Sequence, residues 1–592
     1  MDFSYTNEKN AQIILFLLKE HNIRHVIASP GTTNTALVSS MQQDPYFVMY
    51  SSVDERSAAY MACGLAAELG EPVVISCTGA TASRNYLPGL TEAYYRKLPV
   101  LAITSMQALN KVGHLVAQTI DRSSMPADTV NLSVSLPIVK DSEDVWECEM
   151  KVNQAILELN RNGGGPVHIN LPTTYSKPYS TKELPNYRVI NRISTYDQLP
   201  NLEKNKLAVF VGSHKKWNEA ETLALENFCE LYDAVVFCDH TSGYYGKNRL
   251  LYSISAAQSL FSQKEFLPDI LIHIGEVTGD YATKKMVGTE VWRISEDGEV
   301  RDPFRRLRYI FEMPEKHFFE SYSAKKNNKT YFQRSINIVN SKNSYYTQLN
   351  KHLESTRSKI KALPFSNIWL ASRMASHIPE NSVIHFGILN SLRSWNFFEL
   401  PSSVTAASNV GGFGIDGGLS SLVGASLANS DKLCFAVIGD LAFFYDINVL
   451  GNRHVGNNIR ILLVNNGKGT EFRQYNHHAA YFGEAADEYV AAAGHFGNQS
   501  PKLVKDFATN LGYEYLSASS KEEFEATYER FITPKILDKP IIFEVFTDSA
   551  KESEALEQIQ TLIASPKSKA KALIKETLGD STVNSIKKII RK

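Results

Sequence analysis

Short apolar strands alternate with helical patterns through most of the 592 residues. In the first part of the chain, the strands are HVIAS (25–29), PVVISC (72–77), PVLAITS (99–105) and PVHINLP (166–172). Strands that are apolar on both faces are typical of parallel sheets covered by helices on both sides. We therefore predict an α/β protein built from doubly wound parallel sheets.

Polar segments divide this pattern into three sheet domains followed by a tail. The chain is long enough for three or four domains, each with its own core. The stretch 173–188 indicates a linker, and the basic, Asn/Ser-rich stretch 323–345 indicates a second boundary. The predicted domains are 1–180, 190–335 and 346–550, and the predicted helical basic tail is 551–592.

Charge and cysteine usage limit the classes of partner and compartment. The 62 Lys and Arg balance 63 Asp and Glu, so no global field favours nucleic acid or membrane. The six cysteines show no metal-ligand spacing and several lie in apolar runs, as buried thiols do. The apolar run 13–18 is too short for a membrane span and lacks signal-peptide flanks. These features favour a reducing, cytoplasmic location.

The chain ends in a basic amphipathic pattern. Eight Lys or Arg follow Pro566, against Glu576 and Asp580, and Val583, Ile586 and Ile590 have helical spacing. Such a helix is either a solvated terminal helix or a docking element for an anionic membrane surface or a partner protein.

The stretch 434–469 contains a candidate metal site. One apolar strand ends in Gly439-Asp440, and the next ends in Asn465-Asn466. Parallel strands joined by a helix place these ends at one edge of a sheet, where α/β folds bind ligands. A carboxylate and a carboxamide suit Mg²⁺, which keeps water and accepts phosphate oxygens. The stretch therefore predicts a site for a diphosphate cofactor, although both motifs also occur in purely structural turns.

Three further segments could complete such a site. Glu55 follows a strand and begins a helix of small residues, where an acidic residue can equally be a surface cap. Gly79-Ala80-Thr81 open a helix after a strand, where the backbone can approach a ligand closely. The segment 408–426, SNVGGFGIDGGLSSLVGAS, is glycine-rich and serves either as a phosphate or ring platform or for tight helix packing.

Taken together and in order, these motifs resemble the thiamine diphosphate enzymes of the decarboxylase and acetohydroxyacid synthase type. The resemblance covers about residues 10–550 and implies a pyrimidine-binding domain, a central domain and a diphosphate-binding domain. It implies that Glu55 hydrogen-bonds the cofactor's pyrimidine ring, and that Asp440, Asn466 and the Lys468 carbonyl hold Mg²⁺. The other residues that it implies at the cofactor are Gly79, Ala80, Thr81, Asn390, Ser391, Gly412, Phe413, Gly414, Ile415, Asp416, Gly439 and Leu441.

Within that group the chain is most similar to the menaquinone-pathway synthases that join a succinyl semialdehyde unit to isochorismate. The likeness is carried by VDERSAAYMACGLA, GHLVAQTIDR (113–122), ISEDGEVRDP (294–303), FGILNSLRSW (386–395) and GDLAFFYDINVL.

Several positions depart from that synthase pattern. Thr32-Thr33 stand where the family has Ser-Arg, Val410 stands where it has Arg, and Asp280-Tyr281 stand where some members have a basic pair. A hydrogen bond to a charged group is worth about 1.5–3 kcal/mol, so losing several cations would weaken binding of a polyanionic substrate severely. We therefore expect an acceptor other than isochorismate.

Five polar residues are candidates for substrate contact or proton transfer. Arg393 and Arg84 could hold the carboxylate of the donor or could form structural ion pairs. Gln118 is a substrate candidate by resemblance alone. His477 and His478 could shuttle protons, since histidine titrates near neutral pH, or could simply be solvated.

The leading functional hypothesis is a thiamine diphosphate- and Mg²⁺-dependent carboligase that transfers a decarboxylated 2-oxo acid unit to an acceptor carbonyl or enone. A non-ligating 2-oxo acid decarboxylase and a non-catalytic cofactor-binding scaffold are the alternatives, and a flavin-bound synthase is disfavoured because the middle domain lacks a dinucleotide fingerprint. In the resembling enzymes the glutamate and the metal motif meet across a subunit interface, which implies a homodimer or a homotetramer.

Overall fold

The computed structural model describes residues 3–122, 124–175, 178–202, 206–259, 263–331, 344–496 and 499–563. It divides into two compact units, residues 1–198 with 298–312 and residues 199–297 with 313–592. The predicted basic tail from Pro566 lies outside the described residues. Among the described residues, none of the helices combines the length and the apolarity needed to span a bilayer.

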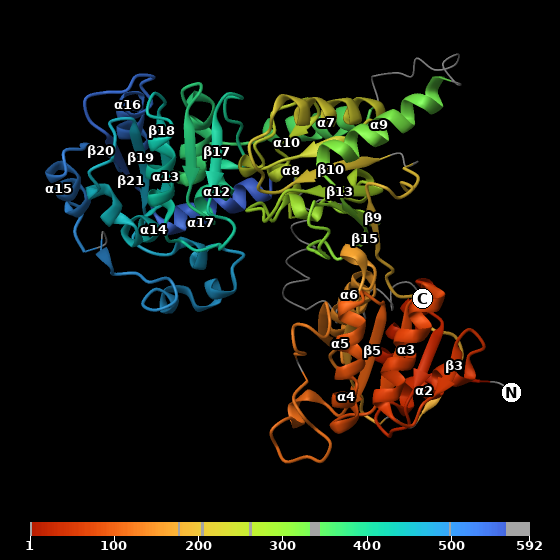
Figure 1. The fold of residues 1–592 in the computed structure, drawn as a ribbon. Helices are drawn as coiled ribbons and strands as arrows, with labels where there is room; N and C mark the ends of the chain where they lie inside the picture. Colours follow the sequence, from red (N-terminus) through yellow and green to blue (C-terminus); the bar gives the residue numbers. More distant parts are fainter. Residues whose placement is uncertain are drawn as a thin grey trace, which may run out of the picture. The chain divides into compact units, whose positions relative to one another are not determined.

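A six-stranded parallel sheet forms the centre of the first unit (Figure 1). Its strand order is β3-β2-β4-β5-β7-β6. The strands are β2 (His25–Ala28), β3 (Val48–Ser51), β4 (Val73–Cys77), β5 (Val100–Met106), β6 (Leu132–Ser135) and β7 (Val167–Pro172). The helices are α1 (Lys9–Glu20), α2 (Thr35–Gln43), α3 (Glu55–Leu69), α4 (Thr81–Asn85), α5 (Leu87–Tyr95) and α6 (Ser142–Glu158).

Both faces of this sheet are buried. One apolar cluster joins Val26, Val74 and Leu101 to residues of α1, α2 and α6. The other joins Ile27 and Ile75 to residues of α3 and α5. Helices therefore cover both faces, as near-continuous apolar strands require, and the predicted doubly wound arrangement is confirmed for this sheet.

Two local expectations for the first unit need correction. The helix that Thr81 was expected to open ends at Asn85, and a second helix, α5, follows at once, because Pro88 lies in its first turn and favours a new helix start. The expected linker 173–188 contains the strand β8 (Tyr179–Thr181), which pairs antiparallel with β1 (Tyr5–Thr6).

The second unit contains two groups of parallel strands. The first group runs in the order β12-β11-β10-β13-β14. Its strands are β10 (Leu207–Val211), β11 (Val235–Phe237), β12 (Arg249–Leu250), β13 (Ile270–Ile274) and β14 (Glu290–Ile294). Its helices are α7 (Glu219–Tyr232), α8 (Ser253–Ala256), α9 (Glu315–Tyr331) and α10 (Tyr345–Arg357).

The second group is a six-stranded sheet with the order β17-β16-β18-β19-β21-β20. Numbered along the chain within each sheet, this order is the same as that of the first unit. The strands are β16 (Val383–Phe386), β17 (Thr405–Ser408), β18 (Cys434–Gly439), β19 (Ile459–Asn465), β20 (Glu514–Ala518) and β21 (Ile541–Phe546). The helices are α11 (Asn367–Met374), α12 (Asn390–Trp395), α13 (Gly418–Leu427), α14 (Asp440–Tyr445), α15 (Leu503–Asn510), α16 (Lys521–Phe531) and α17 (Ser549–Gln560).

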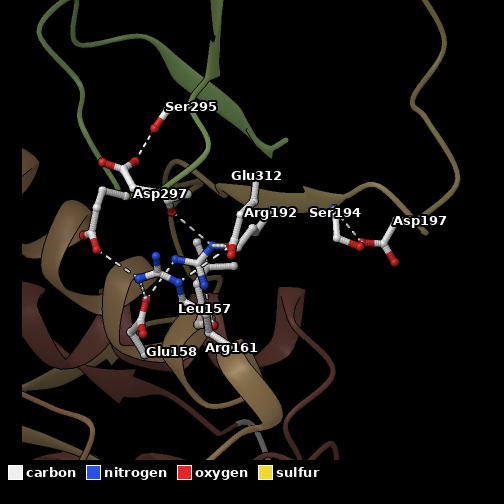
Figure 2. A network of polar contacts seen from close by, with 11 residues as sticks. Leu157, Glu158, Arg161, Arg192, Ser194, Asp197, Ser295, Asp297 and Glu312 are labelled. Carbon is white, nitrogen blue, oxygen red and sulfur yellow. Dashed lines mark hydrogen bonds and ion pairs between the residues drawn. The ribbon is translucent and has the colours of Figure 1, made fainter. Parts of the chain in front are cut away.

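An arginine network ties the segment 298–312 to the first unit (Figure 2). Arg161 Nη1 contacts Glu158 Oε1 at 3.1 Å and Glu299 Oε1 at 3.0 Å. Arg192, in β9 (Asn191–Ser194), contacts Glu158 at 2.9 Å and also Glu312, at the end of β15 (Leu307–Glu312). Both arginine side chains are mostly buried, so these contacts are screened less than surface ion pairs are.

Replacing Arg161 with Met should destabilise the first unit, because it leaves the carboxylates of Glu158, Glu299 and Glu312 with one cation fewer. We expect a loss of about 1–3 kcal/mol, less than for a fully buried pair. The matched control is Arg96→Met, which removes an exposed helical pair with Glu92 and should cost under about 0.5 kcal/mol. Thermal unfolding followed by circular dichroism measures both, and equal effects would contradict a stabilising network.

Candidate functional site

Asp440 and Asn466 lie at neighbouring strand ends in the second unit. Strands β18 and β19 pair in parallel, with Gly439 opposite Val464. Asp440 begins α14, and its carboxylate accepts hydrogen bonds from the backbone N–H of Leu441 at 2.8 Å and of Gly467 at 2.6 Å. The loop after β19 is therefore held against the end of β18.

These residues fit a hard divalent cation. The Asn466 side-chain oxygen is buried and has no hydrogen-bond partner among the described residues, which is unusual for a buried polar atom. Burial raises the pKa of Asp440 to about 6, and a bound cation would offset that cost. The described residues contain no group of three or more His, Cys, Asp or Glu that could hold a metal. One carboxylate, one carboxamide and the Lys468 carbonyl would leave positions for phosphate and water, as Mg²⁺ prefers.

A buried chain of hydrogen bonds holds the loop that carries Asn466 in place. Asn465 donates to Glu544 Oε1 at 2.7 Å, and the Tyr515 hydroxyl donates to Glu544 Oε2 at 2.7 Å. Asn465 also accepts a bond from the Gly467 N–H at 3.2 Å. The loop carrying Asn466 is therefore fixed by β20 and β21.

A cavity of about 230 Å³, here called the cofactor cavity, opens beside Asp440 and Asn466. Of the residues predicted for cofactor and metal in this unit, those that line it are Asn390, Ser391, Ile415, Gly439, Asp440, Leu441, Asn466 and Lys468. Gly412, Phe413, Gly414 and Asp416 are not among its lining residues. Positions 411, 412 and 439 have no atom of another residue near a would-be Cβ, so space for a ligand remains there.

Two glutamates that line this cavity, Glu471 and Glu552, were not among the predicted site residues. Glu552, in α17, is buried, and both of its oxygens accept from the Asn367 N–H at 2.9 and 3.0 Å. Burial raises the pKa of Glu552 to about 7. The position of Glu471 directly after the metal loop was the one signal that could have found it. Glu552 lies more than 80 residues further along the chain, and the sequence gave no signal for it.

Leu389 and Ala80, which each precede a helix at the predicted site, are among the non-glycine residues that adopt a left-handed backbone. Leu389 has φ 62° and ψ −121° just before α12, and Ala80 has φ 55° and ψ −127° just before α4. Residues held in sparsely populated regions cluster at functional sites and persist only where the surroundings enforce them. Both turns therefore carry strain at the carboxyl edge of a parallel sheet.

A second cavity of about 300 Å³, here called the side cavity, shares Asn390 and Glu471 with the cofactor cavity. Arg393 lines it, with Nη1 2.5 Å from Glu471 Oε1 and its guanidinium 4.9 Å from the centre of the Tyr281 ring. His477 also lines the side cavity, and its Nδ1 accepts from the Ala479 N–H at 3.0 Å. His478 is exposed and does not line it.

At two of the positions that depart from the synthase pattern, Val410 and Asp280, the side chain packs against or hydrogen-bonds with its neighbours. Val410 is 3% exposed, and its side chain and that of Leu392 both lie next to Gly279. Asp280 is buried and accepts from Ser253 and from the backbone at Ala282. Neither residue presents a positive charge to the side cavity.

Glu55 is the first residue of α3 in the first unit. Asp54 caps that helix by accepting from the N–H groups of Arg56 and Ser57, so Glu55 does not serve as the cap. Glu55 is half-buried, and its Oε2 accepts from Asn85 at 3.1 Å. Its carboxylate is thus oriented by α4, the helix that Thr81 begins.

The remaining predicted residues of the first unit lie around the turn after β4. A side chain at Gly79 would place its Cβ 2.8 Å from the Gln118 carbonyl oxygen, so only glycine allows this close approach. Arg84 donates to the Asp121 carbonyl at 3.1 Å, in the segment that follows Gln118. Thr33 is buried, and its hydroxyl contacts Thr78 and donates to the Ser105 carbonyl, whereas Thr32 is exposed.

Comparisons with known proteins agree with this geometry. Residues 8–125 match the family model described as thiamine pyrophosphate enzyme, N-terminal TPP binding domain. The chain is 30% identical over 585 residues to 2-succinyl-5-enolpyruvyl-6-hydroxy-3-cyclohexene-1-carboxylate synthase of Bacteroides fragilis, with 93% of this chain and 98% of that protein covered. The chain belongs to this family of thiamine pyrophosphate enzymes.

Other members of the family give the same result. The synthase of Phocaeicola vulgatus is 30% identical over 94% of this chain and 98% of its own length. That of Flavobacterium johnsoniae is 27% identical over 93% and 98%. The predicted resemblance to thiamine diphosphate enzymes is therefore confirmed over nearly the whole chain, and the protein is a thiamine diphosphate-dependent enzyme.

Asn466→Ala should weaken Mg²⁺-dependent binding of thiamine diphosphate at least about tenfold, because it removes the unpartnered oxygen at the strand end. The control is Asn457→Ala, which is exposed just before the opposite end of the same strand and should bind normally. The measurement is the rise in unfolding temperature with cofactor and Mg²⁺ together, since a ligand at 100 times its Kd stabilises by about 2.7 kcal/mol. A full shift in Asn466→Ala would contradict the metal role.

Proposed function

We propose that this protein is a thiamine diphosphate- and Mg²⁺-dependent carboligase that transfers a decarboxylated 2-oxo acid unit to an acceptor other than isochorismate. The observation that carries the proposal is the unpartnered Asn466 oxygen beside the buried Asp440 carboxylate, at the mouth of the cofactor cavity. Thiamine diphosphate, when bound, supplies the carbanion chemistry, and the protein supplies position and electrostatics.

Different residues of this chain would hold the metal, orient the cofactor and exclude water. Asp440, Asn466 and the Lys468 carbonyl would hold Mg²⁺, and Glu55, fixed by Asn85, would orient the cofactor through its carboxylate. Asn390, Ser391 and Leu441 border the cofactor cavity and would exclude water from it.

The choice of acceptor rests on the positions that depart from the family pattern. The relatives are named for a cyclohexene-carboxylate product. In this chain the Thr33 hydroxyl is engaged within its own unit, and Val410 is buried. The lack of cationic side chains at these positions therefore supports a different acceptor.

Product analysis separates the carboligase from the simple decarboxylase. The purified enzyme, with cofactor and Mg²⁺, is offered a panel of 2-oxo acids with and without aldehydes or keto sugars. We expect a new carbon–carbon bonded product whose formation consumes the acceptor and lowers aldehyde release. Aldehyde release that no acceptor alters would leave only the decarboxylase.

Glu55→Gln should reduce turnover by at least about a hundredfold, because positioned acid–base groups contribute about 10²–10⁴-fold to rate. Mg²⁺-dependent cofactor binding should stay measurable, since the metal residues are unchanged. Unaltered turnover would refute the role of Glu55, and loss of turnover with retained binding argues against a non-catalytic scaffold.

We also propose a homodimer, or a pair of dimers. In it, Glu55 of one subunit would complete the site formed by Asp440 and Asn466 of the other, as in the resembling enzymes. The proposal predicts complementation between two inactive variants, Glu55→Gln and Asp440→Asn. After mixing and subunit exchange, random pairing restores one intact site in half of the dimers, about a quarter of wild-type activity. No recovery in verified hybrid dimers would place both residues in one subunit's site.

A reducing, cytoplasmic location is supported by the cysteines. All six are described as free thiols and are buried. Docking of the basic tail on an anionic membrane or a partner stays a prediction from its sequence.

A further inference from the structure

The side cavity has a balanced set of charges and an otherwise neutral polar lining. We infer that it takes a neutral, polyhydroxylated carbonyl compound as the acceptor, and that Glu471 determines this choice by occupying Arg393. The inference rests on the proposed carboligase function and names the substrate class of that site.

Arg393 is engaged before any ligand arrives. Its Nη1 lies 2.5 Å from Glu471 Oε1, and its guanidinium lies over the Tyr281 ring at 4.9 Å. The exposed fractions of the two side chains are 28% and 18%, so solvent screens the pair only in part. The Asn390 amide lies 2.8 Å from the other oxygen of Glu471. Nη1 of Arg393 thus already contacts an internal carboxylate.

The other charged residues of the side cavity do not change this balance. Besides Arg393 and Glu471 they are the buried Asp280 and the exposed Lys285. Two carboxylates and two cations leave no net positive charge for an anion. A carboxylate that approaches Arg393 also meets Glu471 at close range, and like charges brought together in a partly buried site repel strongly.

The uncharged polar side chains that line the side cavity can form hydrogen bonds with the hydroxyl groups of a ligand. Its polar members are Ser253, Ser394, Asn390, Gln474, Asn476, His477 and Gln560. Hydroxyl and carboxamide groups both donate and accept hydrogen bonds, as the hydroxyl groups of a polyol do. The half-exposed ring of Tyr281 offers an apolar face beside them. A cavity of about 300 Å³ suits a small ligand of this kind.

The last turn of α17 fixes one wall of the side cavity. Gln560 lines the cavity, and its side-chain oxygen accepts from the Tyr475 hydroxyl at 2.5 Å. Its carbonyl accepts from the Ser259 N–H at 2.9 Å, and Gln258 donates to the Ile559 carbonyl at 2.7 Å. The polar wall is therefore positioned before a ligand binds, which lowers the entropic cost of recognition.

A 2-oxo acid donor also carries a carboxylate, and the inference assigns it elsewhere. Arg393 is then no anchor for the donor, and Arg84 remains the candidate from the first unit. Succinate binding reports on this point directly, because an available Arg393 would bind it.

The test compares two unreactive four-carbon probes, erythritol and succinate, by saturation-transfer NMR titration of the full-length protein with cofactor and Mg²⁺. For the wild type we expect erythritol to bind and succinate to bind at least tenfold more weakly. In Glu471→Gln, succinate should bind at least tenfold more tightly than to the wild type. The control Glu525→Gln alters the exposed Arg373–Glu525 pair, away from the side cavity, and should leave both affinities unchanged.

Two outcomes would overturn the inference. One is wild-type protein that binds succinate as tightly as erythritol and loses that binding in Arg393→Gln. The other is a folded Glu471→Gln variant without a gain in succinate binding. The double variant Arg393→Gln with Glu471→Gln should lose any gain, which shows that the freed guanidinium is its source.

A turnover arm separates this inference from the proposed function. D-erythrose and succinic semialdehyde are compared as acceptors, and erythrose should be used at least tenfold more efficiently by the wild type. No ligated product with either acceptor, together with the expected probe selectivity, would refute the carboligase while leaving the binding preference intact. Ligation to succinic semialdehyde in preference to erythrose would refute only the inference.

Discussion

The buried Asp440 carboxylate is the group on which the second unit's site depends. Its pKa is raised because it is desolvated, and it accepts hydrogen bonds from the backbone N–H groups of Leu441, in its own helix, and of Gly467, in the neighbouring loop. That arrangement is costly unless a cation completes it. The hydrogen bond to Gly467 brings Asn466 into position, the Asn465–Glu544–Tyr515 chain holds the loop, and the cofactor cavity forms in front of both.

Sequence periodicity was sufficient to predict the sheets, because a strand buried on both faces has few alternatives. It placed Glu55 at the start of α3 and Asp440 at the end of β18, since both positions depend on local strand and helix boundaries. It failed at the split between α4 and α5, where Pro88 begins a new helix within one apolar pattern. It also missed β8, whose pairing with β1 spans more than 170 residues of chain.

The side cavity could not be predicted in the same way, because its walls come from distant segments. Tyr281, Arg393, Glu471 and Gln560 are brought together only by tertiary packing. From the sequence, Arg393 could either hold a substrate carboxylate or form a structural ion pair, and the structure shows an ion pair with Glu471.

The left-handed backbone at Leu389 and Ala80 has a consequence for the cell. Each such residue costs on the order of 1–3 kcal/mol, against a total stability of about 5–15 kcal/mol for a typical domain. Cofactor binding lowers the free energy of the folded state and so offsets this cost. Because proteases remove chains that unfold transiently, the abundance of this enzyme would follow the cellular supply of thiamine even at constant synthesis.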